Sequence, residues 1–196
     1  MTKTRLEAFS DGVFAIVITL LILNIHIPEV DYAHLKEALI AIIPNLVSYV
    51  MSFIIIGVYW VAHHRNFMLI SKVDSIFLWL NILLLLFVSF IPFPTYLIGQ
   101  YPFRKIPLII YGFNLIAANG TGFIMMLYIK YHPELGLGEK TLKSFKTQIP
   151  VYIGVNASYL AAILLAGTFP KISYAIYIIV LFVLVVIYQT KNIIKS

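Results

Sequence analysis

The sequence predicts an all-α membrane protein whose helices cross a bilayer six times. Hydrophobic residues make up 61% of the 196-residue chain and charged residues only 11%, with a mean hydropathy of +0.96. A soluble domain carries about 25% charged residues, so an ordinary globular protein is excluded. The apolar residues form runs of about 20, the length that a helix needs to cross the hydrocarbon core. The alternating pattern of a membrane β-barrel is missing.

Each apolar run in turn predicts one span of a single transmembrane domain that covers residues 1–196. The predicted spans are 8–26, 39–62, 75–98, 107–129, 150–169 and 172–188. The first ends before Pro28, and Pro44 is tolerated because it falls near the start of the second. Pro92 and Pro94 predict a kink or a helix end late in the third. The polar segment 130–146 after the fourth span is expected to be the longest loop.

The distribution of cationic residues predicts the orientation. With six spans, both termini lie on one side, and ten Lys and Arg residues fall on that side against four on the other. The ten are Lys3, Arg5, Arg65, Lys72, Lys130, Lys140, Lys143, Lys146, Lys191 and Lys195, and the four are Lys36, Arg104, Lys105 and Lys171. Cytoplasmic loops carry the excess of positive charge. We therefore expect a multi-pass protein of the cell membrane with both termini in the cytoplasm.

Nothing in the sequence favours an enzyme, a metal site or a cofactor. The chain has no cysteine, which excludes disulfides and thiolate catalysis. His63 and His64 are adjacent, so on a helix they point about 100° apart, and the H-E-x-x-H, G-x-S-x-G and glycine-rich phosphate-binding motifs are missing. A basic stripe with interleaved aromatic residues, typical of nucleic-acid binding, is missing as well. We expect a protein that is not an enzyme and has no cofactor.

Polar residues gather at the mouth of the first span. Arg5, Ser10 and Asp11 begin a segment that is otherwise apolar, and a carboxylate at the edge of the hydrocarbon is costly unless it has a partner or a role. Candidate partners at the same depth are Arg5, Trp60, His63, His64, Arg65 and Asn81. These groups could form a hydrogen-bonded network that fixes the helices, or a proton relay or ion site. The structural network is the favoured interpretation.

The first span also carries an aliphatic stripe. Ile16, Leu20 and Leu23 recur at i, i+4 and i+7, with Thr19 beside them. Asp11 points about 140° away from Ile16, on a separate face. The stripe could line a narrow pore that closes by dewetting, or it could face lipid and neighbouring helices. Periodicity alone favours contact with lipid or neighbours.

Three segments resemble a known family. R-L-E-A-F-S-D-G-V-F-A-I-V-I-T-L-L-I-L at residues 5–23 closely resembles the signature of the transmembrane protein 175 family, the lysosomal potassium channels and their prokaryotic relatives. W-V-A-H-H-R-N-F at residues 60–67 is similar to the end of that family's second span. N-I-L-L-L-L-F-V-S-F-I-P-F-P-T at residues 81–95 is similar to its third. The first motif is specific, whereas the last three spans add little beyond hydropathy.

The resemblance implies a homotetramer, since this chain holds one six-helix repeat. Four copies of the first helix would line a central pore without a T-V-G-Y-G filter. Ile16 would form the narrowest hydrophobic ring, Leu20 and Leu23 further rings, and Thr19 a hydroxyl layer associated with preference for potassium. The residues implied to hold the first helix are Arg5, Phe9, Ser10, Asp11, Trp60, His63 and Asn81.

The leading functional hypothesis is therefore a potassium-permeable cation channel. Its partners would be three further copies of itself, the lipid bilayer, and potassium with other monovalent cations as permeant ions; no nucleic acid is expected. Two alternatives stay open at this point: a proton-permeable channel and a non-conducting membrane scaffold.

Overall fold

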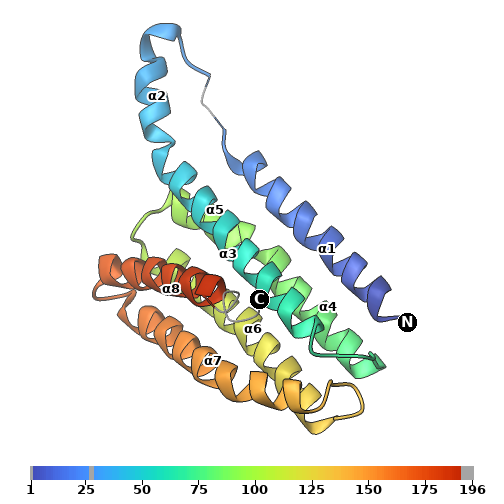
Figure 1. Cartoon of the computed structure of the whole chain (residues 1–196). Helices are drawn as coiled ribbons and strands as arrows, with labels where there is room; N and C mark the ends of the chain where they lie inside the picture. The colour runs from blue at the N-terminus through green and yellow to red at the C-terminus, as the bar shows by residue number, and fades with distance from the viewer. Residues whose placement is uncertain (1, 27–28, 191–196) are drawn as a thin grey trace.

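The computed structural model describes residues 2–26 and 29–190, and these residues are largely helical (Figure 1). The α-helices are α1 (Lys3–Leu20), α2 (Leu35–Ala41), α3 (Ile43–Phe67), α4 (Ser75–Phe90), α5 (Pro92–Gln100), α6 (Lys105–Tyr131), α7 (Glu139–Leu165) and α8 (Pro170–Thr190). Two short 3-10 helices, Leu21–Asn24 and Tyr32–His34, lie between α1 and α2. In the described part of the chain, β-pairing is limited to an isolated bridge between Ile70 and Gly136. The predicted all-α class is confirmed.

Six helical segments of the described chain are long and apolar enough to cross a membrane. They are Lys3–Leu23, Ile43–Phe67, Ser75–Gln100, Lys105–Tyr131, Thr141–Leu165 and Pro170–Gln189. The third segment joins α4 and α5, which meet at Ile91 immediately before Pro92. Six membrane-spanning segments were predicted from hydropathy, and the structure has six.

Several predicted boundaries differ from those of the helices. The helix of the fifth span, α7, begins at Glu139 rather than at Pro150, so much of the expected long loop is helical. Between residues 139 and 149 this segment holds three Lys, one Glu, one Leu and one Gln, which favour helix, and its buried Thr141 and Phe145 give it an inner face. The α-helix of the first span ends at Leu20 and continues as a 3-10 turn to Asn24, not to His26.

The start of the second span also differs from the prediction. Residues 39–62 were expected to be one helix, but α2 ends at Ala41 and α3 begins at Ile43 and continues to Phe67. Pro44 explains the break, because it has no N–H to give to the preceding turn and is accommodated only in the first turn of a new helix. Figure 1 shows α2 extending away from the rest of the bundle.

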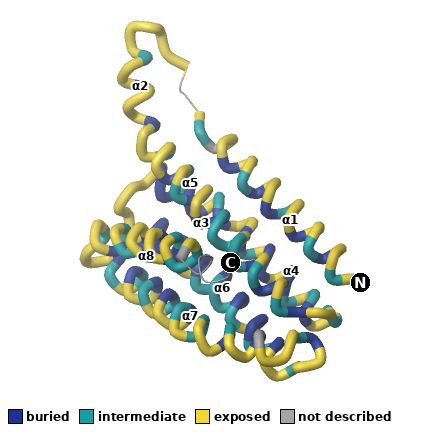
Figure 2. Tube along the Cα trace, in the orientation of Figure 1, coloured by how far each residue is buried: buried dark blue, intermediate teal, exposed yellow. Residues whose placement is uncertain are grey.

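The helix α1 lies at the edge of the bundle, where it packs against α3 and α4 (Figure 1). The helix α6 lies at the centre, in contact with α4, α5, α7 and α8. Figure 2 shows the same contrast in burial, since the outer side of α1 is largely exposed. One face of α1 is therefore not covered by other parts of its own chain.

The first and last helices meet the same end of the bundle. In the first half of α4, Asn81 Nδ2 donates to Ser10 Oγ in the first half of α1, at 3.0 Å. At the end of α3, Arg65 Nη2 donates to the carbonyl oxygen of Tyr188 near the end of α8, at 2.7 Å. The end of α3 and the start of α4 are joined by a short loop, so they lie at the same end of the bundle. The start of α1 and the end of α8 therefore lie at that end too, as expected for a chain that crosses a membrane six times.

Candidate functional site

The helix α1 has two faces with different surroundings. Its buried residues are Leu6, Ser10, Phe14 and Val17, spaced four, four and three apart. That spacing follows one side of an α-helix, and this side packs against α3 and α4. The buried side of α1 is therefore held in place by the other helices of its own chain.

The opposite face of α1 is apolar and exposed. Ile16 is 59% exposed and Leu20 49%, Thr19 beside them is exposed too, and Leu23, in the 3-10 turn that continues α1, is 63% exposed. The structure therefore places all four sequence-predicted pore residues on the outer side of the chain. A continuous apolar stripe of this kind faces either lipid or further copies of the protein.

Thr19 presents an acceptor rather than a donor on this stripe. Its Oγ1 lies 2.9 Å from the carbonyl oxygens of both Ala15 and Ile16, so its proton is directed back into the helix. A hydroxyl has one proton and two lone pairs. The lone pairs of Thr19 consequently remain available to a cation or to water on the exposed side.

A buried chain of hydrogen bonds links α1 to α3 through α4. Asn81 Nδ2 donates to Ser10 Oγ at 3.0 Å, and Asn81 Oδ1 lies 2.8 Å from His63 Nε2. Ser10 and Asn81 are fully buried and His63 is 3% exposed. Because the amide oxygen can only accept, His63 donates from Nε2. We call this set the Ser10–Asn81–His63 chain.

A second link between α1 and α3 lies at the surface. Trp60 Nε1 donates to Asp11 Oδ1 at 2.8 Å, and the Trp60 ring stacks on His64 with ring centroids 6.2 Å apart. The indole therefore supplies the polar partner that the Asp11 carboxylate needs. Trp60 itself is 43% exposed, so this contact is far more accessible to solvent than the Ser10–Asn81–His63 chain.

Five of the seven residues expected to hold the first helix take part in these two links. Ser10, Asn81 and His63 form the buried chain, and Asp11 and Trp60 form the surface contact. Arg5 and Phe9 are exposed. In the described part of the chain the ion pair found is Lys3 with Glu7, at 3.8 Å, and Arg5 does not pair with Asp11. Arg65, another candidate partner, instead bonds to Tyr188 and lies 5.0 Å from the centre of its ring.

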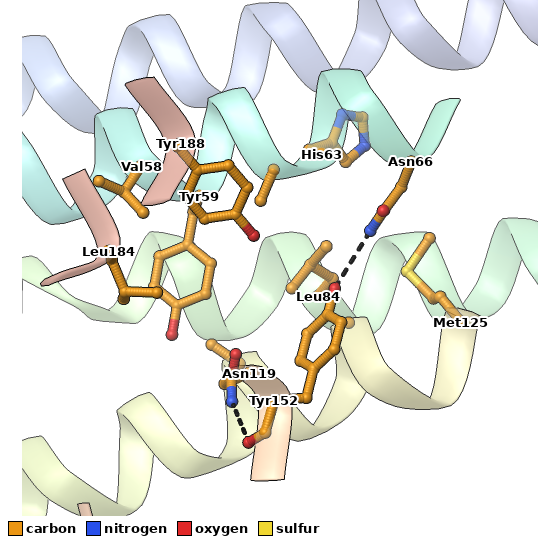
Figure 3. Close-up of a pocket in the computed structure, with 13 residues that line it drawn as sticks. Val58, Tyr59, His63, Asn66, Leu84, Asn119, Met125, Tyr152, Leu184 and Tyr188 are labelled. Atoms are coloured by element: carbon orange, nitrogen blue, oxygen red, sulfur yellow. Dashed lines mark hydrogen bonds between the residues drawn. The ribbon is translucent and has the colours of Figure 1, made fainter. Parts of the chain in front are cut away.

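Sequence reasoning missed several buried polar contacts. Asn66 lies one turn after His63 and donates from Nδ2 to Tyr152 Oη at 3.3 Å, as Figure 3 shows. Ser52 of α3 is hydrogen-bonded to Thr95 of α5. An isolated Asn or Ser within an apolar run was the available signal. No cluster of three His, Cys, Asp or Glu side chains that could hold a metal occurs among the described residues.

Comparison with known proteins decides the family. Residues 5–92 match the model of a family described as the endosomal/lysosomal potassium channel TMEM175. A protein of Chryseobacterium sp. strain P1-3, named as a potassium channel, is 34% identical over 181 residues, which make up 92% of this chain and 91% of that one. The chain belongs to the TMEM175 family.

Other TMEM175 proteins agree in fold and in part of the sequence. The crystal structure of a Chamaesiphon minutus homologue of the lysosomal potassium-selective channel TMEM175 superposes with a TM-score of 0.81 and 30% identity, covering 95% of this chain and 97% of that chain. The human endosomal/lysosomal proton channel TMEM175 is 43% identical over 101 residues, which are 47% of this chain and 20% of the human one. The protein is therefore a multi-pass member of a family of ion channels, which is not an enzyme family.

Proposed function

We propose that this TMEM175 protein is a potassium-permeable cation channel made of four copies of the chain. The observation that carries the proposal is the exposed stripe of Ile16, Thr19, Leu20 and Leu23 on a helix that is held from behind. Relatives named as potassium channels support the choice of ion. The choice of four copies comes from the family resemblance of a one-repeat chain.

A pore lined by α1 needs several copies, because α1 lies at the edge of a single chain (Figure 2). Closed rotational symmetry brings the same face of every copy to a common axis. An edge helix with one packed face and one apolar face suits that position. We place Arg5 and Phe9, both exposed in one chain, against the neighbouring copy.

The stripe would act as gate and selector together. Rings of Ile16, Leu20 and Leu23 are too apolar to replace the hydration shell of an ion, so a narrow pore would dewet and close. Small rotations of α1 would widen the rings enough to keep them wet. Thr19 would supply the hydroxyl oxygens, and we expect weaker selectivity than in a filter lined by carbonyl oxygens.

We also propose the cellular setting. The protein would lie in the cell membrane with both termini in the cytoplasm, because the end of the bundle that holds the start of α1 and the end of α8 carries the larger share of Lys and Arg. Its conduction would require no cofactor beyond the permeant ion.

Proton permeation is the second candidate, favoured by the name of the human relative as a proton channel. The stripe on α1 has no titratable side chain. Protons would therefore have to pass along a chain of water molecules through the same rings. A potassium gradient without a proton gradient separates the two activities.

The test is ion flux from liposomes that contain the purified protein, with the variant Ile16→Asn beside the native chain. An amide ring hydrates the constriction, so we expect Ile16→Asn to raise potassium flux about tenfold. Ile22→Asn is the matched control, because Ile22 is also exposed, at 47%, but lies in the 3-10 turn after α1 and is not one of the four stripe residues. A folded Ile16→Asn protein with unchanged flux would place the gate elsewhere, and no cation flux from either form would overturn the channel proposal.

A further inference from the structure

The helices α6 and α7 are longer than one membrane crossing requires. Each has 27 residues, or about 40 Å of helix, whereas about 20 residues cross the hydrocarbon core. The charged residues of α7 all fall within residues 139–146, and residues 147–165 have none. The uncharged part is long enough to cross the core, so the charged start of α7 lies at the depth of the lipid headgroups.

Lysines gather where α6 ends and α7 begins. Lys143 and Lys146 are exposed on α7, three positions apart, so they lie on the same side of the helix. Lys130 in the last turn of α6 is exposed too, and its Nζ lies 4.5 Å from the centre of the Phe145 ring of α7. In the described part of the chain, none of these three ammonium groups forms an ion pair. The segment 130–149 holds four lysines against two glutamates, so its net charge is positive.

An apolar stripe continues from Lys146 along α7. Ile153 and Leu160 follow Lys146 at i+7 and i+14, which keeps all three on one side of the helix. Ile153 is 58% exposed, Leu160 50% and Leu164, one turn further, 73%. A positive charge at headgroup depth thus lies above a hydrocarbon surface that its own chain leaves uncovered. This combination matches a molecule with an anionic head and an acyl tail.

The end of the bundle that carries the lysines is held by hydrogen bonds between two loops. The Leu137 N–H donates to the carbonyl oxygen of Leu69 at 3.0 Å, and the Ser71 N–H donates to that of Leu135 at 2.8 Å. Thr141 Oγ1, in the first turn of α7, also donates to the Leu69 carbonyl oxygen at 3.0 Å. The loop between α3 and α4 therefore fixes the start of α7. A surface that is already ordered loses little conformational entropy when a ligand binds.

We propose that the outer side of α7 binds an anionic phospholipid. The lipid phosphate pairs with Lys143 and Lys146, and Lys130 adds a third positive charge at the same depth. An acyl chain lies along Ile153 and Leu160. Phosphatidylcholine would fit the apolar stripe equally well, but its headgroup carries no net charge, so charge complementarity selects the anionic lipid. This site is separate from α1 and does not depend on the proposed channel function.

The test measures which lipid occupies this surface. The chain has no cysteine, so Thr147→Cys provides a single attachment point for a fluorescent label on the full chain. Thr147 is exposed beside Lys146, and its hydroxyl donates to carbonyl oxygens of its own helix. Brominated acyl chains quench a nearby fluorophore. In phosphatidylcholine liposomes, we expect brominated phosphatidylglycerol to reach half-maximal quenching at a mole fraction at least threefold lower than brominated phosphatidylcholine.

Paired lysine variants test the cause of this preference. Lys143→Gln with Lys146→Gln should abolish it, because Gln favours helix as Lys does but has no charge. Lys143→Arg with Lys146→Arg keeps both charges and should keep the preference. The matched control is Lys105→Gln with Lys171→Gln, which removes two charges from exposed lysines at the opposite end of the bundle. This control should quench as the labelled parent protein does.

Equal quenching by the two lipids in the labelled parent protein would overturn the site. A preference that survives Lys143→Gln with Lys146→Gln would assign it to other contacts and would overturn the site as well. Loss of the preference in the control pair would show an effect of net charge alone, with the same consequence. The measurement requires no ion flux, so its result is independent of whether the protein conducts.

Discussion

At the scale of single residues, Thr19 is the side chain of the exposed stripe that can interact with an ion. Its proton is held by the carbonyl oxygens of Ala15 and Ile16, which orients the oxygen lone pairs away from the helix backbone. The neighbours Ile16, Leu20 and Leu23 offer hydrocarbon alone. Any preference among cations that arises on this stripe should therefore depend on one hydroxyl.

Replacing Thr19 by Val removes that hydroxyl at nearly constant volume. We expect the ratio of potassium to sodium permeability to fall several-fold, because one hydrogen-bonding group contributes about 1 kcal/mol. Thr19→Ser keeps the hydroxyl and should keep the ratio. Reversal potentials under bi-ionic conditions measure it. An unchanged ratio in Thr19→Val would assign selectivity to other atoms.

At the scale of helices, the position of α1 depends on buried hydrogen bonds more than on charge. Ser10 accepts from Asn81 and donates to the carbonyl oxygen of Leu6 at 2.8 Å, all out of contact with solvent. Removing one partner would leave the Asn81 amide buried and unpaired. An unpaired buried amide destabilises the folded protein more than the loss of a hydrogen bond at the surface does.

We therefore expect Ser10→Ala to lower the free energy of unfolding by about 1–3 kcal/mol. The control is Ser89→Ala in α4, since Ser89 is exposed and bonds only within its own helix; its change should stay within about 0.5 kcal/mol. Denaturant titration in detergent micelles compares the two. Equal losses would show that the Ser10–Asn81–His63 chain does not hold α1.

The start of α4 is fixed by Asp74, which lies outside the membrane-spanning segments. Its Oδ1 accepts from the Phe77 N–H at 2.8 Å, and its Oδ2 accepts from Tyr128 Oη at the end of α6. Partial desolvation alone would raise the pKa of Asp74, but these hydrogen bonds outweigh it and hold the pKa below its usual value. The ionised carboxylate thus joins two helices at one end of the bundle.

A lowered pKa means that the contribution of Asp74 is complete above the pKa of an unfolded Asp and is lost as pH falls through the folded value. At pH near 7, Asp74→Ala should lower the free energy of unfolding by about 0.5–2 kcal/mol, the usual effect of losing a helix N-cap. The difference from native protein should shrink only below about pH 4. Asp74→Asn, which keeps a capping oxygen, is the control. A difference that vanishes by pH 6 would contradict this account.

The sequence predicted some of these elements well because periodicity is a local property. The two faces of α1 follow from its spacing alone, and hydropathy predicts six spans. Residues 139–149 were misassigned because their polarity resembles that of a loop, although Thr141 and Phe145 pack inward. The pairing of Asp11 with Trp60 was not predictable in detail, since several polar groups share one depth and only packing selects among them.

Polar pairs outside this expected network were beyond local reasoning. Asn66 and Tyr152 are 86 positions apart, and neither residue type in an apolar run specifies its partner. The same holds for the small cavity that both residues line, because its walls come from five different helices. Sequence reasoning therefore described the face of α1 better than the surroundings that support it.

At the scale of the whole molecule, α1 differs from the other spans in what it exposes. In the most apolar stretch of the first span, 28% of the residues are buried, as in the sixth span, against 22% in the fifth and 50% in the fourth. Exposure alone would suit lipid. However, the same end of α1 also carries an exposed carboxylate, Asp11, whose partner is the neutral Trp60 indole, and an exposed guanidinium, Arg5, and among the described residues these two charges do not form an ion pair with each other. Charges at the edge of the hydrocarbon call for partners, and a neighbouring copy supplies both signs.

Native mass spectrometry of the purified protein should therefore show four chains of 22.3 kDa each. Asp11→Ala removes the acceptor for Trp60 on α1 and the negative charge at the proposed interface. We expect it to shift the population from tetramers towards single chains while the ratio of potassium to sodium permeability of the remaining tetramers changes less than twofold. Glu134→Ala is the control, because Glu134 is an exposed carboxylate in the loop between α6 and α7. Intact tetramers with an altered permeability ratio would instead place Asp11 in the conduction path, and α1 would then turn its carboxylate rather than its aliphatic stripe towards the ions.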